Sequence, residues 1–293
     1  MAIGRIVKAL SGFYYVENED GIFQCRGRGN FRKRKLTPLV GDWVVFEAEN
    51  RTDGYVLELH DRTNELIRPP IANVEQAVLV FSVHEPAFSP LLLDKFLVHI
   101  EANDIQPLIC LSKMDLLPEE KLEEIRQYKK EYEKIGYEVI STSVHQADTI
   151  EELKPALANR VSVFAGQSGV GKSSLLNAIK PELDLETNAI SKSLNRGKHT
   201  TRHVELIPIE GGYVADTPGF SSLDYHGITE DSLSACYPEM ADRIQECKFR
   251  GCTHSNEPKC AVKAAVEDGE IAQHRYDSYI QFLEEIKSQK RRY

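Results

Sequence analysis

The chain has 293 residues, of which 41% are hydrophobic and 28% charged, and its formal net charge is −9. This composition is typical of a soluble globular protein of two or three domains, and no apolar run is long enough to span a bilayer. The overall negative charge argues against nucleic-acid binding, except where basic residues cluster locally. The N-terminal residues lack the apolar core of a secretory signal, so we expect a cytoplasmic protein with six reduced cysteines.

Residues 1–68 read as all-β. Five segments rich in Val, Ile, Phe and Tyr alternate with Gly, Asn and Asp turns, at residues 4–10, 13–17, 22–26, 42–48 and 55–60. Five short strands predict a small closed barrel, for which the OB-fold is the best-known solution.

A basic loop follows the third predicted strand and contains no acidic residue. Its six cations are Arg26, Arg28, Arg32, Lys33, Arg34 and Lys35. Phe31 offers a stacking face, and charge combined with stacking is typical of loops that contact RNA. The loop is therefore a candidate RNA-binding site, and the alternative is a solvated charged loop.

Residues 69–225 alternate between strands and helices. Pro69 and Pro70 predict an extended linker between the first domain and this one. Strands are expected at 77–82, 107–111, 138–141, 161–165 and 212–215, and helices near 92–100, 122–135, 149–157 and 174–179. Such alternation predicts a mainly parallel sheet covered by helices, with ligand-binding loops at the carboxyl ends of the strands.

One loop in this segment fits the phosphate-binding pattern G-x-x-x-x-G-K-[ST] at every fixed position. It reads Gly166-Gln167-Ser168-Gly169-Val170-Gly171-Lys172-Ser173, and a helix is expected to start at Ser174. Its backbone N–H groups would surround phosphate oxygens, and Lys172 would neutralise the β- and γ-phosphates. The Ser173 hydroxyl would bind Mg²⁺.

Two further loops resemble the guanine-binding loops of GTPases. The stretch Ser112-Lys113-Met114-Asp115 resembles the motif Asn-Lys-x-Asp, in which the Asp accepts hydrogen bonds from guanine N1–H and its exocyclic amine. Ser112 departs from the usual Asn, so guanine selectivity needs a direct test. Ser141-Thr142-Ser143 resembles the short loop that also contacts the guanine.

The two nucleotide-sensing switches of GTPases also have counterparts. Asp216-Thr217-Pro218-Gly219 resembles the second switch, in which the Asp holds Mg²⁺ and the Gly N–H meets the γ-phosphate. The first switch would lie at residues 197–201, where Thr201 is expected to complete the Mg²⁺ shell. Phe220 replaces the glutamine that orients the attacking water in Ras-type GTPases. His199 is the candidate for that role within the chain, the alternative being a surface histidine.

The order of these loops is unusual, because the guanine loops precede the phosphate loop and the switches follow it. This order indicates a circularly permuted GTPase domain. The second switch then runs almost directly into the C-terminal segment, so that a nucleotide-driven movement near Gly219 would pull on that segment.

Residues 226–293 contain a candidate zinc site with the spacing C-x₄-C-x-H-x₅-C. The four ligands are Cys247, Cys252, His254 and Cys260. Three thiolates and an imidazole suit a tetrahedral structural Zn²⁺, which would contribute folding energy to a stretch with little apolar content. Helices are expected at 261–268 and 271–286.

Together, the barrel, the permuted GTPase motifs and the cysteine–histidine segment resemble the bacterial ribosome small-subunit-dependent GTPase A (RsgA) family over essentially the full length. The resemblance implies a P-loop GTP hydrolase that binds GTP, GDP and Mg²⁺ and acts late in assembly of the small ribosomal subunit. It implies docking on the subunit in the GTP form, hydrolysis stimulated by ribosomal RNA, and release as the GDP form.

We also expect a monomer without a membrane partner, whose GDP-accepting pocket is a candidate site for inhibition by guanosine tetraphosphate. Two alternatives remain open at this stage. One is an RNA-binding assembly factor for which GTP is only a regulatory ligand, so that Lys172 or Thr201 variants keep their assembly role. The other is a signalling GTPase with a protein partner, which the basic loop disfavours.

Overall fold

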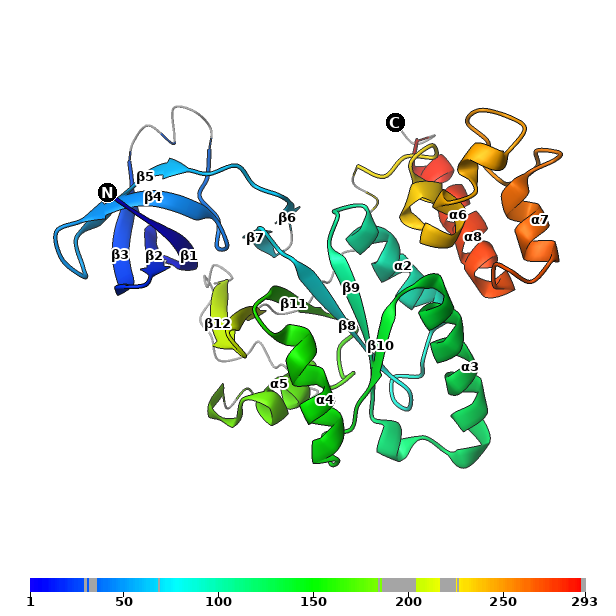
Figure 1. Ribbon diagram of the computed structural model, residues 1–293, viewed down its shortest axis with the longest axis horizontal. Helices are drawn as coiled ribbons and strands as arrows, with labels where there is room; N and C mark the ends of the chain where they lie inside the picture. The colour runs from blue at the N-terminus through cyan, green and yellow to red at the C-terminus, as the bar shows by residue number, and fades with distance from the viewer. Residues whose placement is uncertain are drawn as a thin grey trace. The chain divides into compact units, whose positions relative to one another are not determined.

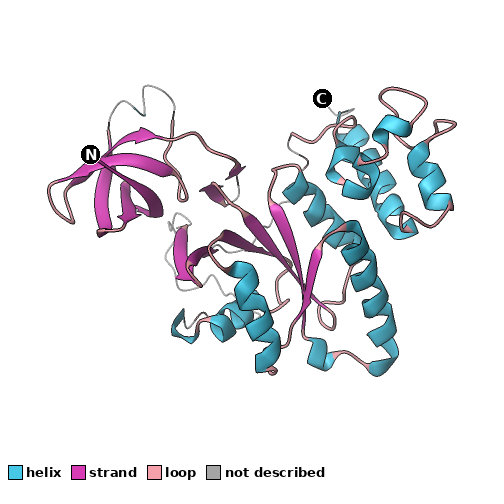
Figure 2. Ribbon diagram, in the orientation of Figure 1, coloured by secondary structure: helices cyan, strands magenta, loops and turns pink. Residues whose placement is uncertain are grey.

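The computed structural model describes residues 1–28, 31, 36–67, 69–183, 185, 204–216, 225 and 227–290 (Figures 1 and 2). The chain divides into two compact units, each of which combines two separate stretches of sequence. Unit 1 contains Met1–Val78 and Val144–Ser221, and unit 2 contains Leu79–Ser143 and Ser222–Tyr293. Within the residues that the structure describes, no helix has the length and apolar character needed to cross a membrane.

Unit 1 begins with a five-stranded barrel. Its strands are β1 (Ala2–Leu10), β2 (Phe13–Asn18), β3 (Gly21–Gly27), β4 (Trp43–Ala48) and β5 (Gly54–Leu59). They pair in the order β1-β2-β3-β5-β4, and a further pairing of β1 with β4 closes the ring. Ile6, Val16, Cys25, Val44 and Val56 are fully buried and form its core. The predicted OB-like barrel is confirmed.

The expected extended linker at Pro69 and Pro70 is wrong. Instead, β6 (Glu65–Ile67) and β7 (Pro70–Ala72) form a short antiparallel hairpin, with Pro70 at the first position of its strand, where a missing N–H is tolerated. The hairpin is docked on the barrel, since the Ala72 N–H donates to the Val40 carbonyl at 2.9 Å. Gly41 has φ of +93°, and a Cβ there would lie 2.0 Å from the Ala72 carbonyl oxygen, so only glycine permits this approach.

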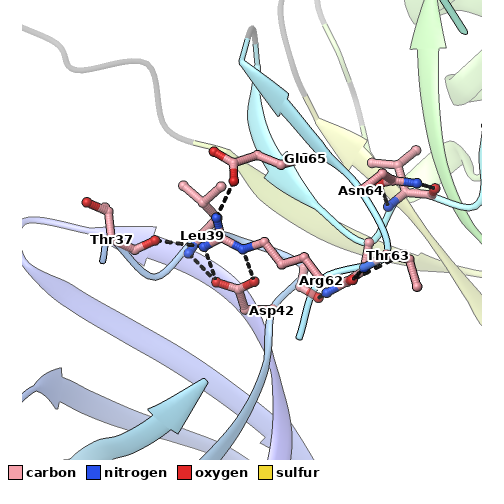
Figure 3. Close-up of polar contacts among 10 residues, drawn as sticks. Thr37, Leu39, Asp42, Arg62, Thr63, Asn64 and Glu65 are labelled. Carbon is pink, nitrogen blue, oxygen red and sulfur yellow. Dashed lines mark hydrogen bonds and ion pairs between the residues drawn. The ribbon is translucent and has the colours of Figure 1, made fainter. Parts of the chain in front are cut away.

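An ion pair to a buried carboxylate reinforces this junction (Figure 3). Asp42 is fully buried. Its Oδ1 accepts a hydrogen bond from Arg62 Nε at 2.7 Å, and its Oδ2 accepts one from Arg62 Nη2 at 2.8 Å. The Leu39 N–H donates to Oδ2 at 2.7 Å, and Arg62 Nη2 also donates to the Thr37 carbonyl at 2.7 Å. Asp42 therefore gains three charge-assisted or backbone hydrogen bonds, which offset the cost of burying its charge. Hydrogen bonding to Asp42 raises the pKa of Arg62.

The rest of unit 1 carries the predicted phosphate loop. Its elements are α4 (Ala147–Leu157), β11 (Val161–Ala165), α5 (Lys172–Ile179), β12 (Glu205–Ile209) and β13 (Gly212–Asp216). Strand β11 pairs in parallel with β13, β13 pairs antiparallel with β12, and β12 pairs antiparallel with barrel strand β1. The sequence reading missed β12, because Pro208 weakens an otherwise apolar stretch.

Unit 2 begins within β8 (Gln76–Ser82), the strand that carries the chain out of unit 1. Its other strands are β9 (Gln106–Ser112) and β10 (Glu138–Ser141). The helices that accompany them are α2 (Pro90–Glu101) and α3 (Glu119–Ile135). Its C-terminal part contains α6 (Pro238–Ala241), α7 (Ala261–Glu267) and α8 (Gln273–Lys290). Short 3₁₀ helices lie at η1 (Met114–Leu116), η2 (Pro181–Leu183, in unit 1), η3 (Leu233–Cys236) and η4 (Ile244–Glu246).

Arg275 is the centre of the packing between α8 and the rest of unit 2. Its guanidinium is fully buried, donates to Asp94 Oδ1 of α2 at 2.6 Å, and reaches Glu239 of α6 at 2.7 and 3.2 Å. The hydroxyl of Tyr132 from α3 also donates to Asp94 Oδ1 at 2.8 Å. Arg275 lies 4.5 Å from the ring centroid of Tyr237. Four helices therefore meet on one charged network.

Candidate functional site

The predicted phosphate loop lies between a buried strand and a helix, which is the context that the motif needs. All five residues of β11 are buried, and α5 begins at Lys172 with Gly171 before it. Gly166, Gly169 and Gly171 have φ values of +139°, +82° and +102°. Residues with side chains avoid this region, so the glycines permit the turn that directs backbone N–H groups toward an anion at the helix N-terminus.

The Lys172 side chain bends back over the loop. Its Nζ donates to the carbonyl oxygens of Gly166 at 2.8 Å and Gln167 at 2.7 Å. Burial lowers the pKa of Lys172. The ammonium group therefore lies against the loop, and an anion bound in the loop would favour its charged form.

The two predicted guanine loops lie side by side in unit 2. The Thr142 N–H donates to the Leu111 carbonyl at 2.7 Å, and the Met114 N–H donates to the Thr142 carbonyl at 3.2 Å. These bonds bring Ser112-Lys113-Met114-Asp115 next to Ser141-Thr142-Ser143. Asp115 is exposed, whereas Thr142 and Ser143 are buried.

The first two residues of the Asp115 loop have defined partners. Ser112 is buried at the end of β9 and its hydroxyl donates to the Phe81 carbonyl at 3.3 Å. Lys113 adopts a left-handed conformation with φ of +62°, and its Nζ donates to the Glu85 carbonyl. The serine that replaces the usual asparagine therefore contacts the backbone of the neighbouring strand β8.

Most of the predicted switch residues lie outside the described residues. These are the first switch with His199 and Thr201, and Thr217, Pro218, Gly219 and Phe220 of the second. Asp216 is the last residue of β13, and its Cα partner across the hairpin is Glu205.

Asn177 is a structured residue near the phosphate loop that sequence reasoning missed. Its amide nitrogen donates to the Leu185 carbonyl at 2.9 Å, and its amide oxygen accepts from the Leu185 N–H at 2.9 Å. The side chain therefore holds the chain at Leu185 against α5. The sequence signal that could have identified Asn177 is a polar residue beside the apolar face of a short helix.

The structure corrects two features of the predicted RNA-binding loop. Phe31 is only 8% exposed and therefore offers no free stacking face. Arg28 has a counter-charge, because its Nη2 lies 2.9 Å from Glu47 Oε1 on β4. Arg26 lies over the ring of Phe13 at 5.0 Å. Arg32, Lys33, Arg34 and Lys35 lie outside the described residues.

The four predicted metal ligands converge. The ligand atoms of Cys247, Cys252, His254 and Cys260 all lie within 4.8 Å of one another. His254 Nδ1 is 3.3 Å from Cys260 Sγ and 3.6 Å from Cys247 Sγ, and those two sulfurs are 3.9 Å apart. A tetrahedral ion with Zn–S and Zn–N bonds of about 2.3 and 2.0 Å needs ligand atoms roughly 3.5–3.8 Å apart. The cluster therefore fits a Cys₃His zinc site.

The metal-ligand loop is supported by groups that its spacing does not reveal. Tyr276 and Tyr279 of α8 donate their hydroxyls to the carbonyls of His254 and Thr253 at 2.7 and 2.8 Å. Glu257 accepts from the N–H and hydroxyl of Thr253 and from the Ser255 N–H. Although burial opposes it, this bonding lowers the pKa of Glu257 to about 2.

The same cysteines also belong to a hydrophobic core, which the sequence reading did not expect. Cys252 and Cys260 pack in the cluster that contains Tyr279, Phe282 and Leu283. Burial raises the pKa of Cys252 to about 12 and lowers the pKa of His254. The imidazole is thus kept neutral, the form that binds a metal, whereas the thiols would have to lose protons on binding.

Comparison with known proteins decides the family. Residues 59–226 match the family model of the RsgA GTPase, and residues 3–56 match that of the RsgA N-terminal domain. The chain belongs to the RsgA GTPase family. A relative from Halalkalibacterium halodurans, named small ribosomal subunit biogenesis GTPase RsgA, is 65% identical over 100% of this chain and 99% of its own.

Solved structures support the permuted architecture of this RsgA family member. The crystal structure of YloQ, described as a circularly permuted GTPase, aligns with a TM-score of 0.86 at 54% identity, covering 99% of this chain and 96% of that one. The crystal structure of YjeQ from Thermotoga maritima aligns with a TM-score of 0.87 at 38% identity, covering 97% and 98%. YloQ therefore supports the unusual loop order, and the predicted fold class and GTPase activity are confirmed.

Proposed function

We propose that this protein hydrolyses GTP to GDP and phosphate during late assembly of the small ribosomal subunit. The observation that carries the proposal is a complete phosphate loop between β11 and α5, in a chain that belongs to the RsgA GTPase family along its length. The name of the Halalkalibacterium relative supplies the small-subunit partner. In this proposal the GTP form docks on the subunit, ribosomal RNA stimulates hydrolysis, and the GDP form leaves.

Within the site, residues 166–174 would hold the phosphates, with Lys172 pairing the β- and γ-phosphates. Ser112, Lys113 and Asp115, together with residues 141–143, would contact the guanine. Ser173, Thr201 and Asp216 would hold Mg²⁺, and the Gly219 N–H would meet the γ-phosphate. Bound Mg²⁺ offsets the charge that develops during phosphoryl transfer.

His199 is the proposed group that orients the attacking water, because Phe220 has no hydrogen-bonding atom for this task. Intrinsic turnover is then expected to be slow, and docking on the subunit would bring the histidine into place. A His199→Ala variant should keep its affinity for GTP and lose the stimulated rate. Unchanged stimulated turnover would remove His199 from the mechanism.

Other parts of the chain would serve the ribosomal partner. We assign residues 1–68 to RNA binding through Arg26, Arg28 and the cations at 32–35, residues 69–225 to the permuted GTPase domain, and residues 226–293 to a domain with one structural Zn²⁺. We further propose a cytoplasmic monomer whose nucleotide pocket also admits guanosine tetraphosphate. The cysteine–histidine geometry supports the zinc assignment.

The deciding experiment is GTP turnover by the purified protein alone, with small ribosomal subunits and with large subunits. Strong stimulation by small subunits only is expected. A Lys172→Ala variant should bind the subunit and fail to turn over GTP. Equal, slow rates in all three samples would contradict a ribosome-triggered GTPase and redirect the search to another activator.

A further inference from the structure

The hairpin between the two predicted switches is hydrogen-bonded to the barrel. Strand β12 follows the first switch, and β13 ends at Asp216, where the second switch begins. The turn between them, Glu210-Gly211, has φ values of +49° and +75°, which fits the tight type I′ turn of a two-residue hairpin. The outer edge of β12 pairs with β1, so one continuous sheet runs from the barrel to the strand that precedes the phosphate loop.

The register places one barrel residue in line with the proposed Mg²⁺ residue. Lys8 of β1 is the Cα partner of Glu205, and Glu205 is the Cα partner of Asp216. Neighbouring strands lie about 4.8 Å apart, so Asp216 stands two strands, roughly 10 Å, from the barrel. Lys8 Nζ and Glu205 Oε2 form an ion pair at 2.8 Å between β1 and β12.

A second contact ties β13 itself to the barrel. The Tyr213 hydroxyl donates to Glu17 Oε2 of β2 at 2.9 Å. The Arg5 guanidinium lies 5.8 Å from the Tyr213 ring centroid and 4.5 Å from that of Trp43. Burial and the bond to Glu17 raise the pKa of Tyr213, so its hydroxyl stays protonated and able to donate. Both strands of the hairpin are therefore attached to the barrel by side chains.

We propose that the barrel positions the switch hairpin through Lys8–Glu205 and Tyr213–Glu17, so that RNA engagement at the barrel and GTP at the phosphate loop influence each other. These four are positioning residues, because they act through Asp216 and the switches. The inference rests on the proposed function and deepens it. By linkage, the factor by which GTP strengthens subunit binding equals the factor by which the subunit strengthens GTP binding.

The test measures the ratio of the protein's affinities for small subunits in the presence of a non-hydrolysable GTP analogue and of GDP. Tyr213→Phe removes the hydroxyl and keeps the ring. Tyr55→Phe is the matched control, because it changes an exposed tyrosine on barrel strand β5 away from the hairpin. Lys8→Glu and Glu205→Lys each break the ion pair, and the double swap restores opposite charges in reversed order.

We expect Tyr213→Phe to reduce this ratio by about fivefold or more, the lower range of known couplings, while GDP affinity stays the same. Each single charge reversal should reduce the ratio by a smaller factor, because the Lys8–Glu205 pair is partly exposed. The double swap should recover the ratio, which a merely destabilised variant would not do, and Tyr55→Phe should match wild type. A wild-type ratio in Tyr213→Phe and in both charge reversals would overturn the inference. If the wild-type protein itself shows neither a nucleotide-dependent ratio nor stimulated turnover, the proposed function fails instead.

Discussion

Replacing Arg275 with methionine should destabilise unit 2 strongly, since this side chain neutralises two carboxylates away from water. Burial alone would lower the pKa of Arg275, but Asp94 and Glu239 raise it well above the usual range. The exposed fractions of the three side chains are 1% for Arg275, 0% for Asp94 and 8% for Glu239. Breaking a buried pair by removing one partner costs about 3–5 kcal/mol, because the remaining charge is left uncompensated.

The matched control is Arg243→Met, the same substitution in the same unit. Arg243 Nη2 lies 2.5 Å from Glu270 Oε2, yet the exposed fractions of the two side chains are 27% and 58%. Exposed ion pairs contribute about 0–1 kcal/mol, so this variant should remain near wild type. Replacing Arg275, Asp94 and Glu239 together by apolar residues of similar size should recover most of the loss, because no charge then stays buried alone.

Urea unfolding followed by two spectroscopic probes measures the loss of stability in Arg275→Met and shows in which unit it occurs. Trp43 is the single tryptophan of the chain and lies in unit 1, so its fluorescence follows the barrel. Among the described residues the longest helices, α3 with 17 residues and α8 with 18, lie in unit 2, so the far-ultraviolet circular dichroism mainly follows that unit. We expect the dichroism midpoint to fall while the Trp43 midpoint stays. A loss no larger than that of Arg243→Met would refute the reasoning.

Three further predictions concern separate sites. Burial alone would raise the pKa of Glu285, but hydrogen bonds from Lys95, Gln281 and Tyr225 lower it. The stability lost in Glu285→Gln should therefore be largest above about pH 4.3 and should vanish as the pH falls further. Unfolding measured at several pH values checks this trend. Cys260→Ser should lower bound zinc measured by elemental analysis from one equivalent toward none and reduce the unfolding midpoint, whereas Cys110→Ser should keep the metal; equal zinc in both would contradict the site. Asp115→Ala should remove the preference for GTP over inosine triphosphate, which lacks the exocyclic amine, and a retained preference in competition binding would place selectivity elsewhere.

Sequence patterning predicted the regular elements well because their signals are local. Strand β11 is a continuous apolar run before a glycine loop, and α3 repeats apolar residues at helical spacing, so both lie where periodicity places them. The cysteine–histidine cluster was equally accessible, since all four ligands fall within fourteen residues. These predictions depended only on short-range spacing in the sequence, and the structure agrees with them.

The errors came from contacts between residues that are distant in sequence. Phe31 reads as an exposed aromatic in a basic loop, but it is buried in the structure, and Arg28 gains a partner nineteen positions away in Glu47. The prolines at 69 and 70 indicated a linker, yet Pro70 starts a paired strand that docks on Gly41. No local pattern reports which side chains a closed barrel brings together, so these features needed the structure.

The circular permutation gives the connection after β13 a particular position in the chain. Asp216 ends a strand that is fixed between β11 and β12, and only the eight residues 217–224 separate it from Tyr225. Tyr225 is anchored in unit 2, where its hydroxyl donates to Glu285 of α8 at 2.9 Å and its ring stacks on His99. The predicted second switch therefore lies in a short connection between two anchored elements. In the unpermuted order further strands and helices would follow this switch within the GTPase domain. We therefore propose that, in the permuted order, a nucleotide-driven movement at this switch would reach the candidate metal-ligand segment directly through the chain.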